Sequence, residues 1–265
     1  MTTKAPPGQI ITVTQRLLDV APSRGRRRAL VSPETSCSYA DFAFRVQAAA
    51  AGLAWRGLQP GEAAGVFLPD AACYALALHA VRTAGGVPSP VAAGLTVDEM
   101  ATQLTDCGAR LLLTAPPLDT AAQAAAERSR VRQVISFGEA PGTVEFGALL
   151  RTGTLPPAPA QPQDWSLLPY SRAPDGTQHS APVSHDDVSG LLRRLDAEVP
   201  IRETDVVLAV PPGDPGRPYT ALLDHALLSG ATVVAAGAGD FDELAAAAGA
   251  HGVTAVLTPD GCARV

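Results

Sequence analysis

Apolar and polar positions along the chain follow two different periods. Short continuous apolar runs, such as residues 63–68 and 110–114, have the length and composition of buried strands. Between such runs lie longer segments such as 40–56, where Phe42 and Val46 share one face at helical spacing. Strands that alternate with helices predict β–α–β units, and therefore an α/β fold with mainly parallel sheets.

Residues that start and stop helices divide the pattern into elements. Thr96 and Glu99 have the spacing of a capping box, and the pair Gly85-Gly86 ends the preceding helical segment. The expected strands are 29–32, 36–39, 63–68, 87–91, 110–114, 132–136, 166–170, 205–210, 232–235 and 254–257. The expected helices are 40–56, 71–84, 97–107, 119–128, 186–195, 219–228 and 241–251.

A proline-rich stretch interrupts this alternation after residue 138. Proline fixes φ and lacks an N–H, so such a stretch favours a linker or a surface crossing. The sequence therefore predicts a first α/β lobe at 1–140, a linker or crossing at 141–164, and a second α/β lobe at 165–265.

Charge and hydropathy exclude some classes of function. The 265 residues carry a net charge of −6 and no long basic run, which argues against nucleic-acid binding. No stretch has the eighteen or more apolar residues of a membrane span, and the first residues lack a signal-peptide pattern. We therefore expect a cytoplasmic protein with no membrane partner.

Cysteine and lysine usage limits the available chemistry. Cys37, Cys73, Cys107 and Cys262 are far apart and form no C-x-x-C pair, so no metal site is expected. Lys4 is the only lysine among 20 basic residues. Any chemistry that needs a positioned ammonium group must therefore use Lys4.

Several runs in the same order resemble one family. Residues 37–42, 50–62 and 65–70 are similar to the opening of acyl-CoA synthetases of the 4-coumarate:CoA ligase type, and 80–91 and 103–114 are similar to the units that follow. The chain is therefore identified as a degenerate, N-terminal part of a member of the adenylate-forming (AMP-binding) superfamily. The resemblance implies two lobes of mainly parallel sheet flanked by helices, without the family's mobile C-terminal domain.

The family's phosphate loop reads approximately Tyr-Ser-Ser-Gly-Thr-Thr-Gly-Leu-Pro-Lys-Gly-Val, whereas residues 170–181 read Tyr-Ser-Arg-Ala-Pro-Asp-Gly-Thr-Gln-His-Ser-Ala. Pro174 lacks an N–H donor, Asp175 places a negative charge where phosphate oxygens would lie, and His179 replaces the lysine. The degenerate positions considered for nucleotide contact are Ser171, Arg172, Asp175, Gly176, Thr177 and His179. We therefore expect no cofactor, and neither ATP with Mg²⁺ nor CoA to bind productively.

Two further family features do not match. Where the family has Pro-x-x-His near the acyl pocket, Pro215 occupies the histidine position. The family's adenine motif, ribose-binding aspartate, hinge and catalytic lysine would follow Val265, so we expect them to be absent.

The candidate catalytic residues all have simpler structural interpretations. The candidates are Tyr170, Asp175, His179, His185 and Asp214. His185 follows Ser184, a suitable N-cap. His179 and Asp175 are typical of a surface ion pair. His79, His225 and His251 fall within helices and suit packing or surface roles.

Three functions remain open from the sequence. The first is a non-adenylating pseudoenzyme of a bacterial biosynthetic pathway that binds a small acyl or aromatic molecule or a partner protein, with homodimerisation also open. The second is an ATP-independent enzyme acting on an acyl or polyketide-like intermediate in the old acyl pocket. The third is a residual acyl-adenylating ligase.

Overall fold

Two sheets form the centre of the protein. The computed structural model describes residues 8–32, 35–173, 177–210, 216–236, 241–258 and 261–265. Within these, the first sheet is entirely parallel, in the order β4 (Val87–Pro90), β3 (Ala63–Phe67), β5 (Leu111–Thr114), β6 (Gln133–Ser136) and β7 (Val144–Glu145). The second runs in the order β15 (Gly261–Arg264), β14 (Ala255–Thr258), β12 (Val206–Ala209), β13 (Thr232–Ala235), β1 (Arg28–Val31) and β2 (Cys37–Ser38). Its inner pairs are parallel, and its two edge strands are antiparallel to their neighbours. The expected α/β class is thus confirmed.

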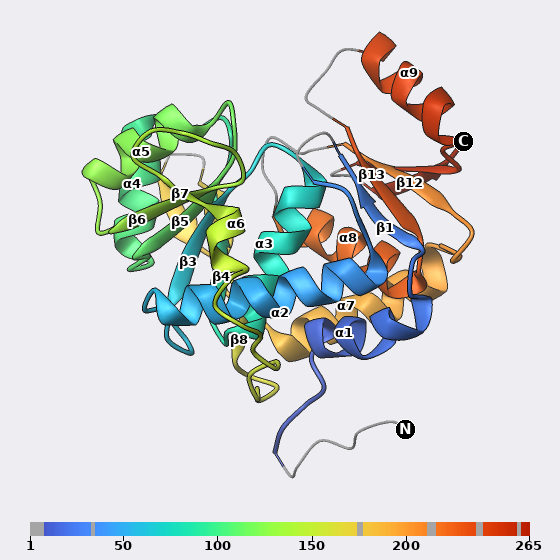
Figure 1. The fold of residues 1–265 in the computed structure, drawn as a ribbon, viewed down its shortest axis with the longest axis horizontal. Coiled ribbons are helices and arrows are strands. Elements are labelled where there is room, and N and C mark those ends of the chain that lie inside the picture. The colour runs from blue at the N-terminus through green and yellow to red at the C-terminus, as the bar shows by residue number, and fades with distance from the viewer. Residues whose placement is uncertain (1–7, 33–34, 174–176, 211–215, 237–240, 259–260) are drawn as a thin grey trace.

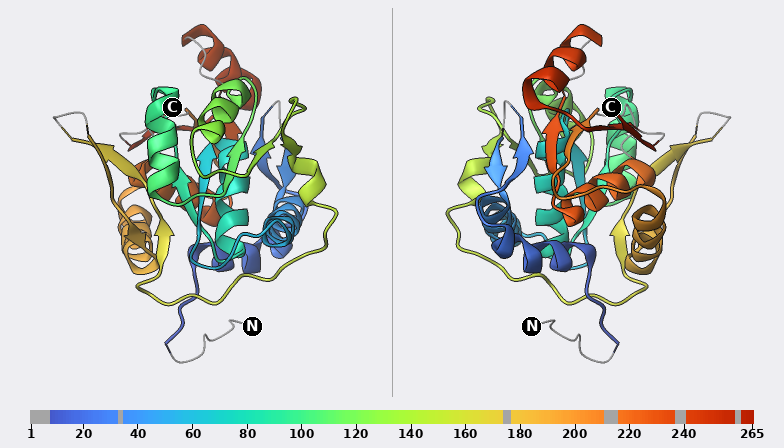
Figure 2. Two further views of the ribbon diagram at one scale, coloured as in Figure 1. Left: turned by 90° about the vertical axis from the view of Figure 1, so that its left-hand side faces the viewer. Right: turned by 90° about the vertical axis from the view of Figure 1, so that its right-hand side faces the viewer.

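Two short antiparallel pairs lie outside these sheets. Strand β8 (Trp165–Leu167) pairs with β11 (Val183–Ser184), and β9 (Tyr170–Arg172) pairs with β10 (Gln178–Ser180). The second pair is a hairpin that extends away from the body of the protein (Figure 2).

Helices pack around the sheets. They are α1 (Val13–Arg24), α2 (Tyr39–Trp55), α3 (Ala71–Thr83), α4 (Val97–Asp106), α5 (Asp119–Glu127), α6 (Phe146–Leu149), α7 (His185–Glu198), α8 (Arg217–Ser229) and α9 (Phe241–His251). Those from α2 to α9, apart from α6, lie where the hydrophobic periodicity predicts them. The expected capping box of Thr96 and Glu99 is confirmed, and Ser184 with Asp187 forms another at the start of α7. These caps fix where the helices begin.

The elements form layers around a buried helix. Helix α3 lies between the two sheets, and all of its residues are buried (Figure 1). It packs on α2 as well as on β3, β4 and β13, so its side chains contact apolar surfaces on every side. Helices α4 and α5 pack beside the first sheet, while residues of α9 pack against apolar side chains of the second. A helix enclosed in this way must either be apolar or satisfy its polar groups internally.

Sheet membership does not follow the expected contiguous lobes. Strands β1 and β2 fall within the expected first lobe, yet Leu30 aligns with Val233 and Val31 with Val234 in the second sheet. The sequence pattern identifies a strand, but its neighbour is chosen by packing between distant segments. The N-terminal strands therefore complete the C-terminal sheet.

Five local expectations differ from the structure. Helix α1 and the edge strand β15 were not expected. The expected strand 166–170 is divided, since β8 and β9 pair with different partners, and β10 lies in a segment where no strand was expected. The stretch 141–164 contains β7 and α6 and then crosses the surface, held by the hydrogen bond from Ala158 N to Thr83 O at 2.9 Å.

Within the described parts of the chain, no helix is long and apolar enough to span a bilayer.

Candidate functional site

The degenerate phosphate-loop segment lies at the carboxyl end of β4. Residues 165–170 run beside this strand: Leu168 N donates to Pro88 O at 2.9 Å, and Ser89 Oγ donates to Leu168 O at 3.0 Å. The chain then continues into the β9–β10 hairpin. Ligands of open α/β folds bind outside the carboxyl ends of the strands, so the hairpin occupies the expected edge.

The described residues of the hairpin, 170–173 and 177–180, do not form a concave ring of backbone donors. Ser171 pairs with His179 and Arg172 with Gln178, and Ala173 N donates to Thr177 O at 2.8 Å. In an antiparallel pair, successive N–H groups point alternately toward and away from the partner strand. Phosphate binding by backbone requires several N–H groups that converge on one point. The described part of this segment lacks that arrangement.

The cation of the hairpin is already paired with a carboxylate. Arg172 Nη2 lies 2.6 Å from Glu99 Oε1 at the start of α4. Hydrogen bonds from the backbone of Thr96, together with Arg172, lower the pKa of Glu99 to about 2. Glu99 therefore stays ionised at neutral pH, and an incoming phosphate would have to displace it from the guanidinium.

Tyr170 is anchored in the same way. Its hydroxyl donates to Asp106 Oδ2 at 2.5 Å, and partial burial and this carboxylate raise the tyrosine pKa. A neutral phenol that donates to a carboxylate is a poor general base at neutral pH. Tyr170 thus fixes the base of the hairpin.

The remaining predicted loop residues are exposed or undescribed. His179 is exposed, and its Nε2 lies 2.9 Å from Thr177 Oγ1. Asp175 and Gly176 lie outside the described residues, so the expected Asp175–His179 pair stays a prediction. A cavity of about 290 Å³ beside the hairpin is lined in part by Tyr170, Ser171, Arg172 and Gln178.

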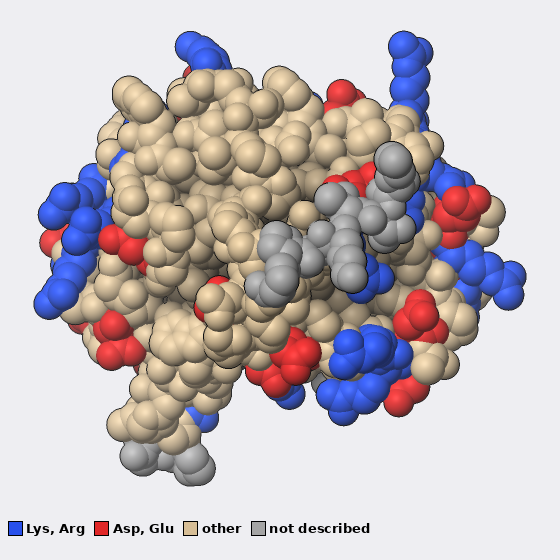
Figure 3. Space-filling view, turned by 90° about the horizontal axis from the view of Figure 1, so that it is seen from below, with Lys and Arg blue, Asp and Glu red and all other residues tan. Residues whose placement is uncertain are grey.

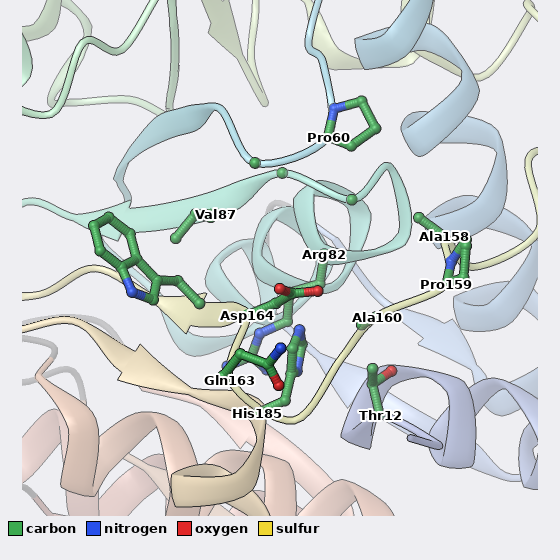
Figure 4. A pocket seen from close by; sticks show the side chains of 14 residues that line it. Thr12, Pro60, Arg82, Val87, Ala158, Pro159, Ala160, Gln163, Asp164 and His185 are labelled. Carbon is green, nitrogen blue, oxygen red and sulfur yellow. The ribbon is translucent and has the colours of Figure 1, made fainter. Parts of the chain in front are cut away.

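His185 lies at the opposite end of β4. As the first residue of α7 it is 8% exposed, and its backbone N–H donates to Asp164 O at 3.0 Å. Its side chain lines a cavity of about 460 Å³ beside Arg82 and Val87, where β4 begins (Figure 4). The candidate catalytic residues are thus divided: Tyr170 and His179 lie at one end and His185 at the other. Asp214 lies outside the described residues.

A buried polar cluster lies behind His185. Arg82 Nη1 contacts Asp224 Oδ2 at 2.9 Å, and His79 Nε2 contacts Asp224 Oδ1 at 3.2 Å. Thr14 Oγ1 lies 2.9 Å from His79 Nδ1, and Arg82 Nε donates to Ser166 O at 2.9 Å. The cluster therefore links α1, α3, α8 and β8.

The charges of this cluster follow from burial and pairing. Burial lowers the pKa of His79 despite its contact with Asp224, so the ring is neutral. Burial alone would raise the pKa of Asp224, but the charge of Arg82 and the contact with His79 keep it low. The cluster is thus an Arg82–Asp224 ion pair beside a neutral histidine, whose Nε2 faces Asp224 Oδ1 and whose Nδ1 faces Thr14 Oγ1.

No local sequence motif predicts this cluster. Arg82 and Asp224 are far apart along the chain and meet only because α3 and α8 pack together. The sequence does show polar residues within otherwise apolar helical segments: His79 and Arg82 in one, and Asp224 in another. Such residues indicate that a buried polar contact exists, but not which residues form it. Across the parts of the chain that the structure describes, no three His, Cys, Asp or Glu side chains are grouped to hold a metal ion.

Comparison with known proteins establishes the family. The model of the family described as AMP-binding enzyme matches residues 18–262. The chain belongs to this AMP-binding family. It is 30% identical over 243 residues to the salicyl-AMP ligase / salicyl-S-ArCP synthetase of Mycobacterium tuberculosis, covering 86% of this chain and 42% of that protein. It is 26% identical over 195 residues to the 4-hydroxybenzoate–CoA/benzoate–CoA ligase of Rhodopseudomonas palustris, covering 72% and 36%.

Solved structures show the same fold for this family member. A long-chain-fatty-acid–CoA ligase from Archaeoglobus fulgidus superposes with a TM-score of 0.81 at 18% identity, over 95% of this chain and 52% of that one. The N-terminal domain of FACL13 from M. tuberculosis gives 0.79 at 17% identity, over 91% and 61%. The chain covers 42% of the salicyl-AMP ligase and 36% of the 4-hydroxybenzoate–CoA/benzoate–CoA ligase, which is less than half of each curated relative. At such identities the superpositions establish the fold, and the site must be judged from its own residues.

Proposed function

We propose that this AMP-binding family member does not adenylate, and that it acts by binding a small acyl or aromatic molecule without ATP. The observation that carries the proposal is the hairpin at the position of the phosphate loop. Its paired backbone presents no converging N–H groups in the described part, and its arginine is paired with Glu99.

The sequence of the hairpin supports the same proposal. Asp175 adds a negative charge that repels phosphate, and Pro174 removes a donor. His179 replaces the family's lysine, and the exposed ring contacts Thr177. We therefore propose no nucleotide, Mg²⁺ or CoA cofactor for this chain.

The relatives support the class of ligand. The two curated relatives described above are named for salicyl, 4-hydroxybenzoate and benzoate groups. A third curated relative is 4-coumarate–CoA ligase 2 of Nicotiana tabacum. All of these groups are aromatic acids or their acyl forms. A binding protein that retained the scaffold would bind an aromatic acyl compound from a biosynthetic pathway, either as a monomer or as a homodimer.

ATP–pyrophosphate exchange tests this proposal. Purified chain is mixed with ATP, Mg²⁺, labelled pyrophosphate and, in turn, salicylate, benzoate, 4-hydroxybenzoate and 4-coumarate. We expect no label in ATP above a protein-free control. Exchange that depends on one of the acids would show a residual ligase and overturn the proposal.

A further inference from the structure

The cavity of about 460 Å³ at the beginning of β4 has the size of a small-molecule site. One wall is the crossing segment around Ala158 and Ala160, which is fixed by hydrogen bonds to Thr83 and Ile10. This segment passes along the lower edge of the protein in Figure 2. In the view from below, the Lys, Arg, Asp and Glu side chains lie mainly toward the rim of the described surface (Figure 3). The cavity thus has a defined wall along the crossing segment.

Two buried polar groups at this cavity have no partner. Arg82 is 7% exposed; its Nε and Nη1 are bonded to Ser166 and Asp224, but Nη2 has no hydrogen-bond partner among the described residues. The ring of His185, 8% exposed, likewise makes no hydrogen bond within the described parts of the chain. Arg82 Nη2 is enclosed by protein, so the ring of His185 is the group of the two that a ligand in the cavity can reach. A buried polar group without a partner costs free energy of folding, which makes this ring a natural contact for a ligand.

The other lining groups define what a ligand must offer. The side chains of Arg82, Gln163, Asp164 and His185 gather at the centre of the cavity (Figure 4). The ring of Trp165 also lines it and is 51% exposed, so it offers an uncovered aromatic surface. A planar ligand with an aromatic part and a polar group matches these two regions.

The balance of charge favours a neutral ligand. The positive charge of Arg82 is already compensated by Asp224 behind it. Asp164 is exposed, and its carboxylate accepts only the backbone N–H of Gln161 among the described residues. A free carboxylate ligand would be repelled by Asp164 without an uncompensated cation to hold it. A carboxamide supplies a carbonyl for His185 and an N–H for Asp164.

We propose that this cavity binds a neutral aromatic acyl compound, of which an aromatic carboxamide is the simplest case. The carbonyl accepts from the ring of His185, the N–H donates to Asp164, and the aromatic ring of the ligand lies against Trp165. This inference rests on the proposed binding function and locates it at the end of β4 opposite the hairpin. The chain would then recognise an acyl group that has already been converted to a neutral derivative, in preference to the free acid.

Fluorescence titration with benzamide and benzoate tests the site. Trp55 and Trp165 are the chain's 2 tryptophans, so Trp55→Phe leaves Trp165 as the single reporter. We expect saturable change in its emission with benzamide, with a dissociation constant on the order of 1 mM for so small a ligand. Benzoate should bind about fivefold more weakly or worse, because of its charge.

Two substitutions in the same background distinguish a specific site from surface adsorption. Asp164→Asn keeps an oxygen for the Gln161 N–H but removes the negative charge. The dissociation constants of benzoate and benzamide should then differ by no more than about twofold. His185→Gln should weaken both ligands. Glu203→Gln, at the exposed Arg27–Glu203 pair, is the matched control and should leave both affinities unchanged.

Three results would overturn the inference. The first is no saturable binding of benzamide, and the second is equal or tighter binding of benzoate by the unsubstituted site. The third is that the affinities stay unchanged in both Asp164→Asn and His185→Gln. Asp164 is exposed, so its variant can be compared even if His185→Gln unfolds the chain. Because no nucleotide is present, the result is separate from the exchange assay. An adenylating chain that also bound benzamide here would refute the proposed function and leave this site intact.

Discussion

The two ends of β4 differ in how their polar groups are satisfied. At the carboxyl end, Arg172 is paired with Glu99 and the Tyr170 hydroxyl with Asp106, in partly exposed contacts within the protein. At the amino end, Arg82 and His185 are buried beside a cavity and keep polar atoms without protein partners. The described groups at the end that carries the family's motif are thus paired within the protein, while the amino end is where we propose a ligand site.

This difference shows that a family motif and a usable site are separate properties. The hairpin lies at the position of a phosphate loop, and in its described part Arg172 is paired with Glu99 and the two strands are paired with each other. The cavity at the other end has no motif in the sequence, because its polar groups come from α3, α7 and the crossing segment. Function must therefore be argued from each end separately.

The largest expected effect is at the amino end, where Asp224→Ala removes the partner of a buried guanidinium. Side-chain exposure of the Arg82–Asp224 pair is 2% and 0%, so an unpaired Arg82 charge should cost about 3–5 kcal/mol of unfolding free energy. Urea denaturation followed by circular dichroism measures this. The exposed-pair variant Glu203→Ala should cost less than about 1 kcal/mol. Equal losses for the two would contradict the contrast between buried and exposed pairs.

The double variant Arg82→Met with Asp224→Leu refines this comparison. It removes both charges and leaves apolar side chains in the same space, so most of the loss from Asp224→Ala should be recovered. If the double variant were less stable than Asp224→Ala, the unpaired charge would not be the cause of the loss.

A pH dependence should also arise mainly at the amino end. Burial, and then the charge of Arg82, lower the pKa of His185 to about 4, whereas an unfolded histidine titrates near about 6.5. Between these values the unfolded state binds more protons, so stability is fully present above pH 6.5 or so and falls as pH decreases toward 4. The expected loss is on the order of 2–3 kcal/mol. His79, with its lowered pKa, acts in the same direction.

Urea midpoints at several pH values between about 7 and 4.5 measure this dependence. His185→Asn should flatten the curve, and substitution of the exposed His251 should leave its shape unchanged. A curve that stays equally steep in His185→Asn would show that His185 does not cause the dependence.

The smallest expected effect is at the carboxyl end. Glu99→Gln breaks the ion pair with Arg172, whose side chain is 47% exposed, but glutamine still completes the capping box with Thr96. The expected change in unfolding free energy is below about 1 kcal/mol and should shrink further at high salt. A loss comparable to that of Asp224→Ala would remove the distinction between the two ends.

Much of the fold could be predicted from the sequence because its signals are local. The Thr96–Glu99 capping box, the apolar run of β5 and the helical face of α2 depend on neighbouring residues, and the structure confirms them. The family resemblance added the order of the elements, which the AMP-binding match confirms.

What could not be predicted depends on pairing between distant segments. The choice of β13 as the neighbour of β1, the hairpin contact between Arg172 and Glu99, and the Arg82–Asp224 pair each join residues with no local relation. Helix α1 was not predicted, although Thr12 as an N-cap and Val13 and Leu17 at helical spacing were available signals; Pro22 is an unusual residue inside a helix. The proposal that the loop does not serve nucleotide remains a prediction.

Isothermal titration with ATP and Mg²⁺ tests that central claim most directly. The matched variant restores the family's loop with Arg172→Ser, Ala173→Gly, Pro174→Thr, Asp175→Thr and His179→Lys, and inorganic tripolyphosphate with Mg²⁺ serves as a second probe that needs no adenine contacts. The account predicts no measurable binding of either probe by the natural chain and tripolyphosphate binding by the restored variant. Binding of ATP with Mg²⁺ by the natural chain at micromolar concentration would contradict it.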